Sequence, residues 1–107
     1  MEVERYGVYW VNLDPTIGKE IKKTRPVVVV SPDVMNRNLG TVLVCPLTTS
    51  KKKYPGRVYV EVNSKTSAIA IDHIRSIDKS RIGNRLGKLS NKESDQLVET
   101  ILEVFKK

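Results

Sequence analysis

The sequence predicts an α+β fold that is mainly β, a small barrel of short strands with short helices and a helix at the C-terminus. Three observations support this. Several short β-rich runs are separated by turn residues, and one segment near the C-terminus has the spacing of an amphipathic helix. The length of 107 residues is that of one compact domain. We therefore expect a single domain over residues 1–107.

Strand-like runs dominate the first half of the chain. Residues 7–13 alternate aromatic and apolar side chains up to a turn at Asp14. After a polar loop over residues 16–24, residues 25–31 include four consecutive valines, which favour a central strand buried on both faces. Residues 41–46 form a further β-rich run.

The second half predicts two more strands. Residues 57–62 alternate as a half-buried strand does. Residues 67–77 are apolar with polar residues between, which we interpret as one core strand. The stretch that follows, with Gly83 and Gly87, is interpreted as a connection.

Two helical segments are expected. Ser31 has the character of a cap, and Pro32 suits a first helical position, so residues 32–37 are predicted to form one short turn. Ser90 and Glu93 match the capping box that starts a helix. The face of this last helix that we expect to lie on the sheet consists of Leu97, Val98, Ile101, Leu102, Val104 and Phe105.

Composition narrows the function classes. Nineteen Lys and Arg against 12 Asp and Glu leave a formal charge of +7, which favours phosphates or an acidic partner. Cys45 is the only cysteine and His73 the only histidine, so one chain cannot form a disulfide or a Cys-His metal cluster. We expect no metal and no cofactor. The apolar run 26–30 is far too short for a membrane helix, which predicts a cytoplasmic protein.

Two polar residues at the ends of predicted strands are candidates for catalysis. RNA can be cut without a metal when a protein aligns the 2′-hydroxyl with the neighbouring phosphorus and stabilises the charge that develops. Arg25 enters the valine strand and could grip phosphate oxygens, and Thr48 leaves the next strand with a hydroxyl. Both residues also have a purely structural interpretation. Arg25 could form a surface salt bridge with Glu20 or Asp72. Thr48 could be an ordinary turn residue whose hydroxyl binds its own backbone.

Four blocks resemble the MazF/PemK family of ribonuclease toxins. They are residues 10–20 (WVNLDPTIGKE), 25–29 (RPVVV), 45–49 (CPLTT) and 71–77 (IDHIRSI). The likeness runs in order from Tyr6 to the C-terminal helix. It implies an SH3-like barrel, a twisted antiparallel sheet also found in CcdB toxins.

The resemblance also implies a function. It implies a homodimeric toxin of a type II toxin-antitoxin system that cuts single-stranded mRNA at specific sequences without a metal. The products would carry 2′,3′-cyclic phosphate and 5′-hydroxyl ends, and translation and growth would stop. The implied partner is an antitoxin whose acidic C-terminal tail covers the same groove.

Site residues carry over by position. Arg25 and Thr48 match the family's catalytic pair, and Glu20 lies in its substrate loop as a proton acceptor, a bracket for Arg25 or a solvated carboxylate. His73 stands where many relatives have glutamine, so acid-base chemistry and a hydrogen-bonded core histidine both stay open. The expected RNA contacts are Ile17, Gly18, Lys19, Lys22, Asn36, Thr49, Ser50, Lys51, Lys53, Tyr54, Asp72, His73, Arg75 and Ser76.

Two alternatives differ in class. A CcdB-like toxin on the same barrel would act on a protein target such as DNA gyrase and leave RNA whole. An RNA-binding barrel without chemistry would suit the charge and the β-rich pattern equally well. Arg25 and Thr48 within basic loops favour the nuclease.

Overall fold

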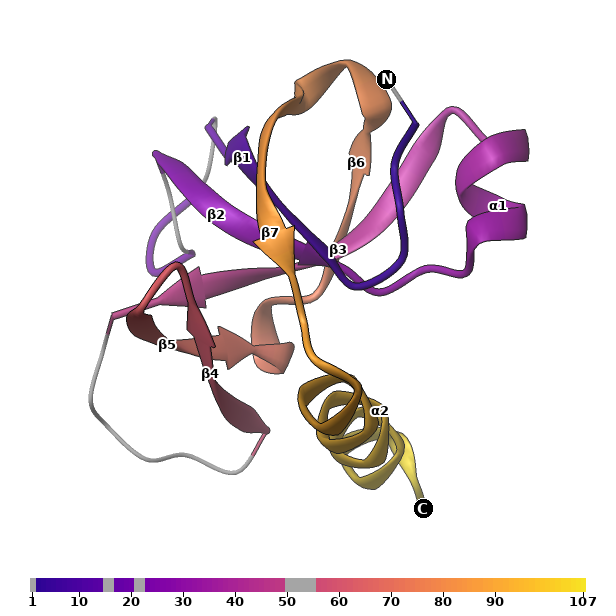
Figure 1. Ribbon diagram of the computed structural model, residues 1–107. Helices are drawn as coiled ribbons and strands as arrows, with labels where there is room; N and C mark the ends of the chain where they lie inside the picture. Colours follow the sequence, from indigo (N-terminus) through magenta and orange to yellow (C-terminus); the bar gives the residue numbers. More distant parts are fainter. Residues whose placement is uncertain (1, 15–16, 21–22, 50–55) are drawn as a thin grey trace.

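A curled antiparallel sheet with a long helix below it forms the molecule, as the computed structural model shows for residues 2–14, 17–20, 23–49 and 56–107 (Figure 1). The expected mainly β fold, a small barrel-like antiparallel sheet with short helices and a C-terminal helix, is confirmed, and the sheet curls into a half-barrel. Its elements are β1 (Gly7–Asn12), β2 (Thr24–Val29), α1 (Asp33–Asn38), β3 (Thr41–Thr48), β4 (Arg57–Val62), β5 (Lys65–Ala70), η1 (Ile71–His73), β6 (Arg75–Asp78), η2 (Lys79–Arg81), β7 (Ile82–Lys88) and α2 (Asn91–Phe105).

Strand β3 organises the sheet. The strand order is β4-β5-β3-β2-β1-β7, and β6 also pairs with β3. The end of β3 pairs with β5 through Leu47 and Thr48, whereas its first half pairs with β6 from Thr41 to Val44. One strand therefore borders both parts of the curled sheet. Within the described ranges, no helix is long and apolar enough to cross a membrane.

The valine strand is central and buried on both faces, as predicted. Val27, Val28 and Val29 are each fully buried, and β2 lies between β1 and β3. Because side chains alternate along a strand, Val28 packs in one core with Leu97 of α2, while Val27 and Val29 pack in a second core on the other face. The sheet thus separates two apolar clusters.

The prediction of one core strand over residues 67–77 is wrong. The chain forms β5, turns through the three residues of η1, and continues as β6. The turn is needed because β5 and β6 pair with different halves of β3, and β6 is shifted along that strand relative to β5. As a result, Asp72 and His73 lie in a turn and not in a strand.

The stretch interpreted as a connection, around Gly83 and Gly87, is strand β7. It pairs with β1, and its residues include few of the β-branched types that mark a strand in sequence. Gly83 is required by a close approach, since an added Cβ would lie 2.8 Å from the carbonyl oxygen of Trp10. Backbone pairing therefore forms this strand where side-chain pattern gives no sign of it.

The two helices follow the sequence in part. The capping box of α2 is present, with Ser90 and Glu93 exchanging hydrogen bonds. Leu97 is fully buried and Ile101 packs against the core, but the expected apolar face does not lie wholly on the sheet, because Leu102 and Phe105 are 65% and 64% exposed.

The short helix α1 forms where it was predicted, but it begins differently. Pro32 is the N-cap and makes no side-chain cap bond. Ser31 instead donates from Oγ to Oδ1 of Asn36 at 2.5 Å and accepts from the amide of Leu43. The serine thus fastens α1 to β3 and does not cap the helix.

Candidate active site

The expected catalytic pair lies at neighbouring strand ends. Arg25 is the second residue of β2 and Thr48 the last residue of β3. The two strands are antiparallel with Val27 opposite Pro46 as the last pair of their ladder, and Arg25 and Thr48 each lie two residues beyond this pair, toward the same end. Residues opposite one another in such a pair point to the same face of the sheet. Both side chains are half-buried.

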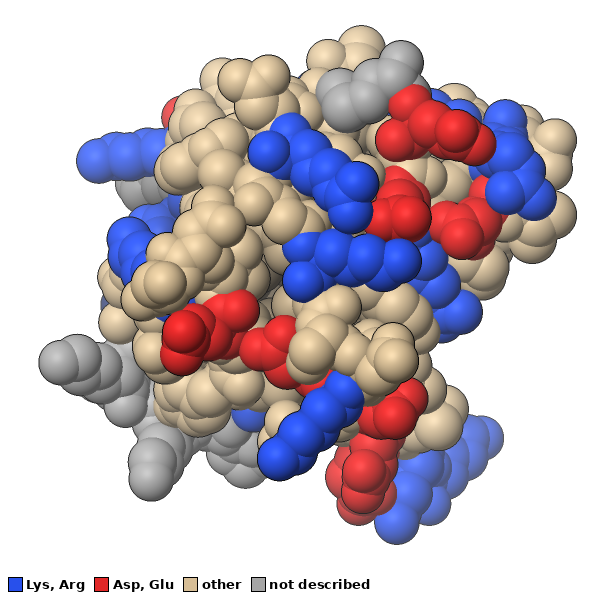
Figure 2. Space-filling model, viewed as in Figure 1, with Lys and Arg blue, Asp and Glu red and all other residues tan. Residues whose placement is uncertain are grey.

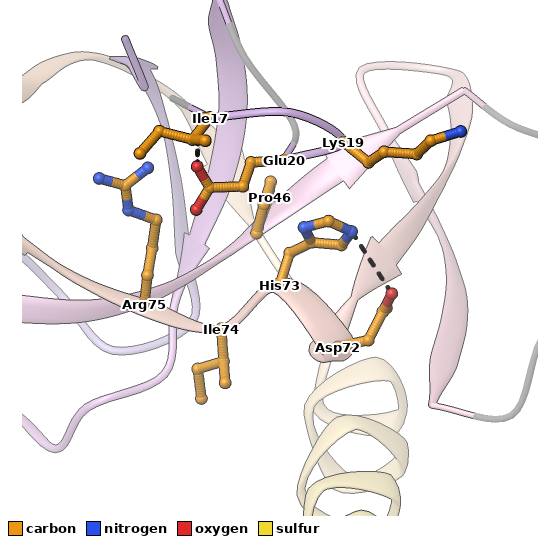
Figure 3. A pocket seen from close by; sticks show the side chains of 8 residues that line it. All are labelled: Ile17, Lys19, Glu20, Pro46, Asp72, His73, Ile74 and Arg75. Carbon is orange, nitrogen blue, oxygen red and sulfur yellow. Dashed lines mark hydrogen bonds and ion pairs between the residues drawn. The ribbon is translucent and has the colours of Figure 1, made fainter. Parts of the chain in front are cut away.

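The structure has a pocket of about 570 Å³ (Figure 3), and Arg25 and Thr48 are not among the described residues that line it. Pro46 belongs to its lining and, two residues before Thr48 in β3, shares the strand face of that threonine. The other lining residues come from two distant segments, the chain between β1 and β2 and the turn from η1 into β6. The whole lining is Ile17, Lys19, Glu20, Pro46, Asp72, His73, Ile74 and Arg75.

The pocket gathers many of the residues that the sequence marked as RNA contacts. The fold brings residues 17–20 against residues 72–75, more than fifty positions away, because β3 lies between β2 and β6. The expected site residues that line the pocket are Ile17, Lys19, Glu20, Asp72, His73 and Arg75.

Asp72 is held by an arginine that the sequence did not single out. The Nε and Nη2 atoms of Arg57 donate to the two carboxylate oxygens of Asp72 at 2.9 and 3.1 Å. Partial burial raises the pKa of Asp72, but the hydrogen bond and charge of Arg57 outweigh it, so the pKa lies below its ordinary value. Asp72 thus pairs with Arg57, an interaction between strand β4 and η1 that the spacing of the sequence does not indicate.

His73 projects into the pocket between Pro46 and Asp72 (Figure 3). Its Nε2 lies 3.5 Å from Oδ2 of Asp72, close enough for an ion pair when the imidazole is protonated. The side chain is 27% exposed, so the ring is partly buried and still accessible from the pocket. This position allows the imidazole to meet a bound ligand.

The loop before β2 is shaped by Glu20 itself. The carboxylate of Glu20 accepts a hydrogen bond from the backbone amide of Ile17, and the amide of Glu20 donates to the carbonyl of Ile17 at 3.2 Å. Gly18, between them, has φ +60°, which glycine adopts without strain. Glu20 therefore closes its own turn and also lines the pocket.

Three expected RNA contacts lie apart from this pocket. Asn36 is 2% exposed in α1, and its amide nitrogen donates to the carbonyl of Ser31. Ser76 alternates with Arg75 along β6 and so points to the other face of the sheet. Thr49 is exposed and lines a second, more apolar pocket with Trp10. The fold does not bring these three side chains to the candidate site.

Part of the predicted basic surface lies outside the described residues. This applies to the expected contacts Lys22, Ser50, Lys51, Lys53 and Tyr54.

Positive and negative side chains alternate over the face shown in Figure 2, around β7 and α2. Ion pairs also offset part of the positive charge, since Glu4 pairs with Arg85 at 2.9 Å and with Lys88 at 3.4 Å. The excess of positive charge is therefore not a continuous patch on this face. Among the described residues, no three or more His, Cys, Asp or Glu side chains are grouped so that they could hold a metal ion.

Comparison with known proteins identifies the class. Residues 4–105 match the model of the PemK-like, MazF-like toxins of type II toxin-antitoxin systems. The endoribonuclease EndoA of Bacillus subtilis is 32% identical over 94% of this chain and 92% of its own length. The endoribonuclease toxin MazF of Escherichia coli K12 is 33% identical over 90% of this chain and 86% of its own length.

Solved structures agree in fold. A crystal structure of MazF from Deinococcus radiodurans superposes with a TM-score of 0.86 at 25% identity and covers 97% of this chain and 96% of its own. A mycobacterial endoribonuclease in complex with its cognate antitoxin superposes with a TM-score of 0.80 at 22% identity, covering 94% of this chain and 91% of its own.

The half-barrel and the extent of these matches define a toxin of a type II toxin-antitoxin system. The chain belongs to the PemK/MazF family, which confirms the resemblance found in the sequence.

Proposed function

We propose that this toxin is an endoribonuclease that cuts single-stranded mRNA at specific sequences without a metal and thereby stops translation and growth. The observation that carries the proposal is a pocket lined by acidic, basic and imidazole side chains, whose β3 residue Pro46 lies two positions before Thr48 and opposite Val27, two positions after Arg25. The relatives named endoribonucleases, at 32% and 33% identity over most of the chain, support the same activity.

The reaction that fits this arrangement is an internal transfer at phosphorus. The 2′-hydroxyl of the RNA loses its proton and its oxygen bonds to the adjacent phosphorus. The bond from phosphorus to the 5′-oxygen breaks, and that oxygen takes up a proton. The products are a 2′,3′-cyclic phosphate and a 5′-hydroxyl, and the enzyme must hold the reactants in line and stabilise the phosphorane charge.

Arg25 supplies that stabilisation in our proposal. The planar fork of a guanidinium group can bind two phosphate oxygens at once. The hydroxyl of Thr48, at the neighbouring end of β3, donates to a phosphate oxygen or receives the 2′-hydroxyl proton. Their half-buried position strengthens both interactions over those in bulk water.

The proton acceptor is one of two pocket groups. Glu20 presents a carboxylate on the loop, and His73 presents an imidazole beside Asp72. Histidine is the side chain that enzymes use most often as a general acid or base. Lys19 and Arg75, also in the lining, would hold the phosphates on either side of the cut.

We further propose that the toxin acts in the cytoplasm as a homodimer and is inhibited by an antitoxin with an acidic C-terminal tail. Support for the antitoxin comes from the family description and from the neighbour of the same fold bound to its cognate antitoxin. An acidic tail would meet Lys19 and Arg75 in the pocket and exclude RNA.

The experiment that tests the activity incubates the purified protein with long single-stranded RNA in EDTA and maps the fragment ends. We expect discrete cuts with cyclic phosphate and 5′-hydroxyl ends. Arg25→Ala and Thr48→Ala should each lower cleavage at least 100-fold, the scale of one lost charge-stabilising donor (about 10²–10³). Arg85→Ala and Thr66→Ala, the same changes at exposed sites outside the pocket lining, serve as controls.

Two results would contradict the proposal. Several varied RNAs left uncut by the wild type would direct attention to a protein target such as gyrase. RNA that is bound but never cut would favour a binding barrel without chemistry.

A further inference from the structure

The segment that brings Glu20 to the pocket is fastened at its base. Leu13, just after β1, donates its amide to the carbonyl of Lys23, just before β2, at 3.0 Å. The amide of Lys23 donates in turn to Oδ1 of Asp14 at 3.1 Å. These bonds close the two ends of the loop against each other.

Two arginines hold the same base from outside. The Nη1 of Arg75 donates to the carbonyl of Leu13 at 3.3 Å, and the Nη2 of Arg81 donates to the carbonyl of Asp14. Arg75 begins β6 and Arg81 ends η2, so consecutive carbonyls of the loop base are bound by side chains from the two ends of one segment.

The packing beneath these bonds makes the support rigid. The side chain of Leu13 is fully buried in the same core as Ile77 of β6 and Ile82, the residue after Arg81. Segment 75–82 and the loop base therefore share one apolar core, in addition to the hydrogen bonds of the two guanidinium groups. A charged donor on a neutral carbonyl makes a stronger hydrogen bond than a neutral pair does.

We infer that Arg81 is a positioning residue for RNA cleavage, which holds the loop so that Glu20 and Lys19 face the pocket. This inference rests on the proposed nuclease function. Arg81 is outside the pocket lining, unlike Arg75, so its effect would pass through the loop. It is half-buried against the loop base.

The test combines a structural and a catalytic measurement on Arg81→Ala. We expect the amides of Leu13 and Lys23 to exchange hydrogen about tenfold faster, while the amide of Leu89, bonded to Tyr6, keeps its rate. The kcat/KM for RNA should fall about tenfold, the scale of one charge-assisted hydrogen bond, mainly through kcat because Glu20 would be displaced in the transition state.

Two variants isolate the cause. Arg81→Lys keeps a cation that can donate one bond and should recover part of both losses. Arg85→Ala removes the same charge from an exposed residue that pairs with Glu4, and should leave exchange and cleavage within about twofold of wild type.

Each remaining outcome overturns the inference. If the hydrogen exchange rates are unchanged in Arg81→Ala, the guanidinium does not fix the loop base. If exchange is faster but kcat/KM is unchanged, fixing the loop base does not contribute to cleavage. A wild type that cuts no RNA would defeat the proposed function, whereas the exchange measurement would still decide whether Arg81 fastens the loop.

Discussion

At the scale of single residues, the pocket is ordered by a chain of three side chains. Arg57 binds both oxygens of Asp72, and Asp72 lies 3.5 Å from Nε2 of His73. The pKa of Asp72 is thereby held below its ordinary value, and the ionised carboxylate lies beside the imidazole ring. Loss of Arg57 would disturb His73 through Asp72, although Arg57 does not line the pocket itself.

Because of the Arg57–Asp72 ion pair, we expect part of the free energy of unfolding to depend on pH in the acidic range. Because the pKa of Asp72 is lower in the folded state, its contribution is present above its unfolded pKa and is lost as the pH falls through the folded value. Asp72→Asn should cost less than about 1 kcal/mol at pH 7, since the carboxylate is half exposed. Urea unfolding at pH 7 and at pH 3 should show the difference from wild type shrinking in acid.

Asp95→Asn, at an exposed position of α2, serves as the control for this measurement. An Asp72→Asn variant whose deficit is equal at both pH values would rule out the contribution of the ion pair.

At the scale of elements, the break between β5 and β6 makes the site. Had residues 67–77 formed one strand, Asp72 and His73 would have continued a ladder along β3. The turn η1 instead raises both side chains from the sheet beside Pro46. The pairing of β3 with two successive strands therefore generates the polar wall of the pocket.

Strand β7 predicts a glycine-specific effect. An added Cβ at Gly83 would lie 2.8 Å from the carbonyl oxygen of Trp10, and this backbone cannot move without disturbing the β1–β7 ladder. Gly83→Ala should therefore lower the free energy of unfolding by about 1–3 kcal/mol, as overpacking does. Urea denaturation measures this loss.

Gly40→Ala is the matched control, because nothing lies within 4 Å of its added Cβ and its φ lies outside the left-handed region. It should change stability by no more than about 0.5 kcal/mol. Equal effects of the two substitutions would mean that the approach of Trp10 is not what requires Gly83.

At the scale of the whole molecule, we expect only a few of the residues behind the net charge of +7 to contribute to RNA binding. Figure 2 shows basic and acidic side chains interleaved on one face. Ion pairs such as that of Lys88 with Glu4 also neutralise part of the charge. Lys19 and Arg75, by contrast, lie together in the pocket lining. RNA affinity should therefore depend on pocket cations more than on the total charge.

Salt dependence tests this distribution. For a 2′-O-methyl RNA that cannot be cut, log Kd should vary linearly with log salt, with a slope of about 0.7 for each phosphate neutralised. Lys19→Ala should reduce the slope by about 0.7, whereas Lys88→Ala should leave it unchanged. Fluorescence anisotropy from low to moderate salt measures both. Equal changes of the slope in the two variants would indicate that RNA affinity depends only on the net charge of the protein.

Much of the fold follows from sequence alone, because its signals are local. Four successive valines specify a strand buried on two faces, and Ser90 with Glu93 specifies the start of α2 through bonds between near neighbours. The ordered motifs around Arg25 and Thr48 were sufficient to indicate the family, which the match over residues 4–105 confirms. The catalytic roles of these two residues stay predictions.

Only the tertiary structure decided what depends on pairing between distant segments. Strand β7 exists because β1 offers it a backbone partner, and the turn at Asp72 exists because β3 pairs with both β5 and β6. The Arg57–Asp72 ion pair and the hydrogen bond from Arg81 to the carbonyl of Asp14 also join segments that are distant in the sequence. Backbone hydrogen bonds and long side chains can join residues at any separation, so neither periodicity nor spacing along the chain reveals these contacts.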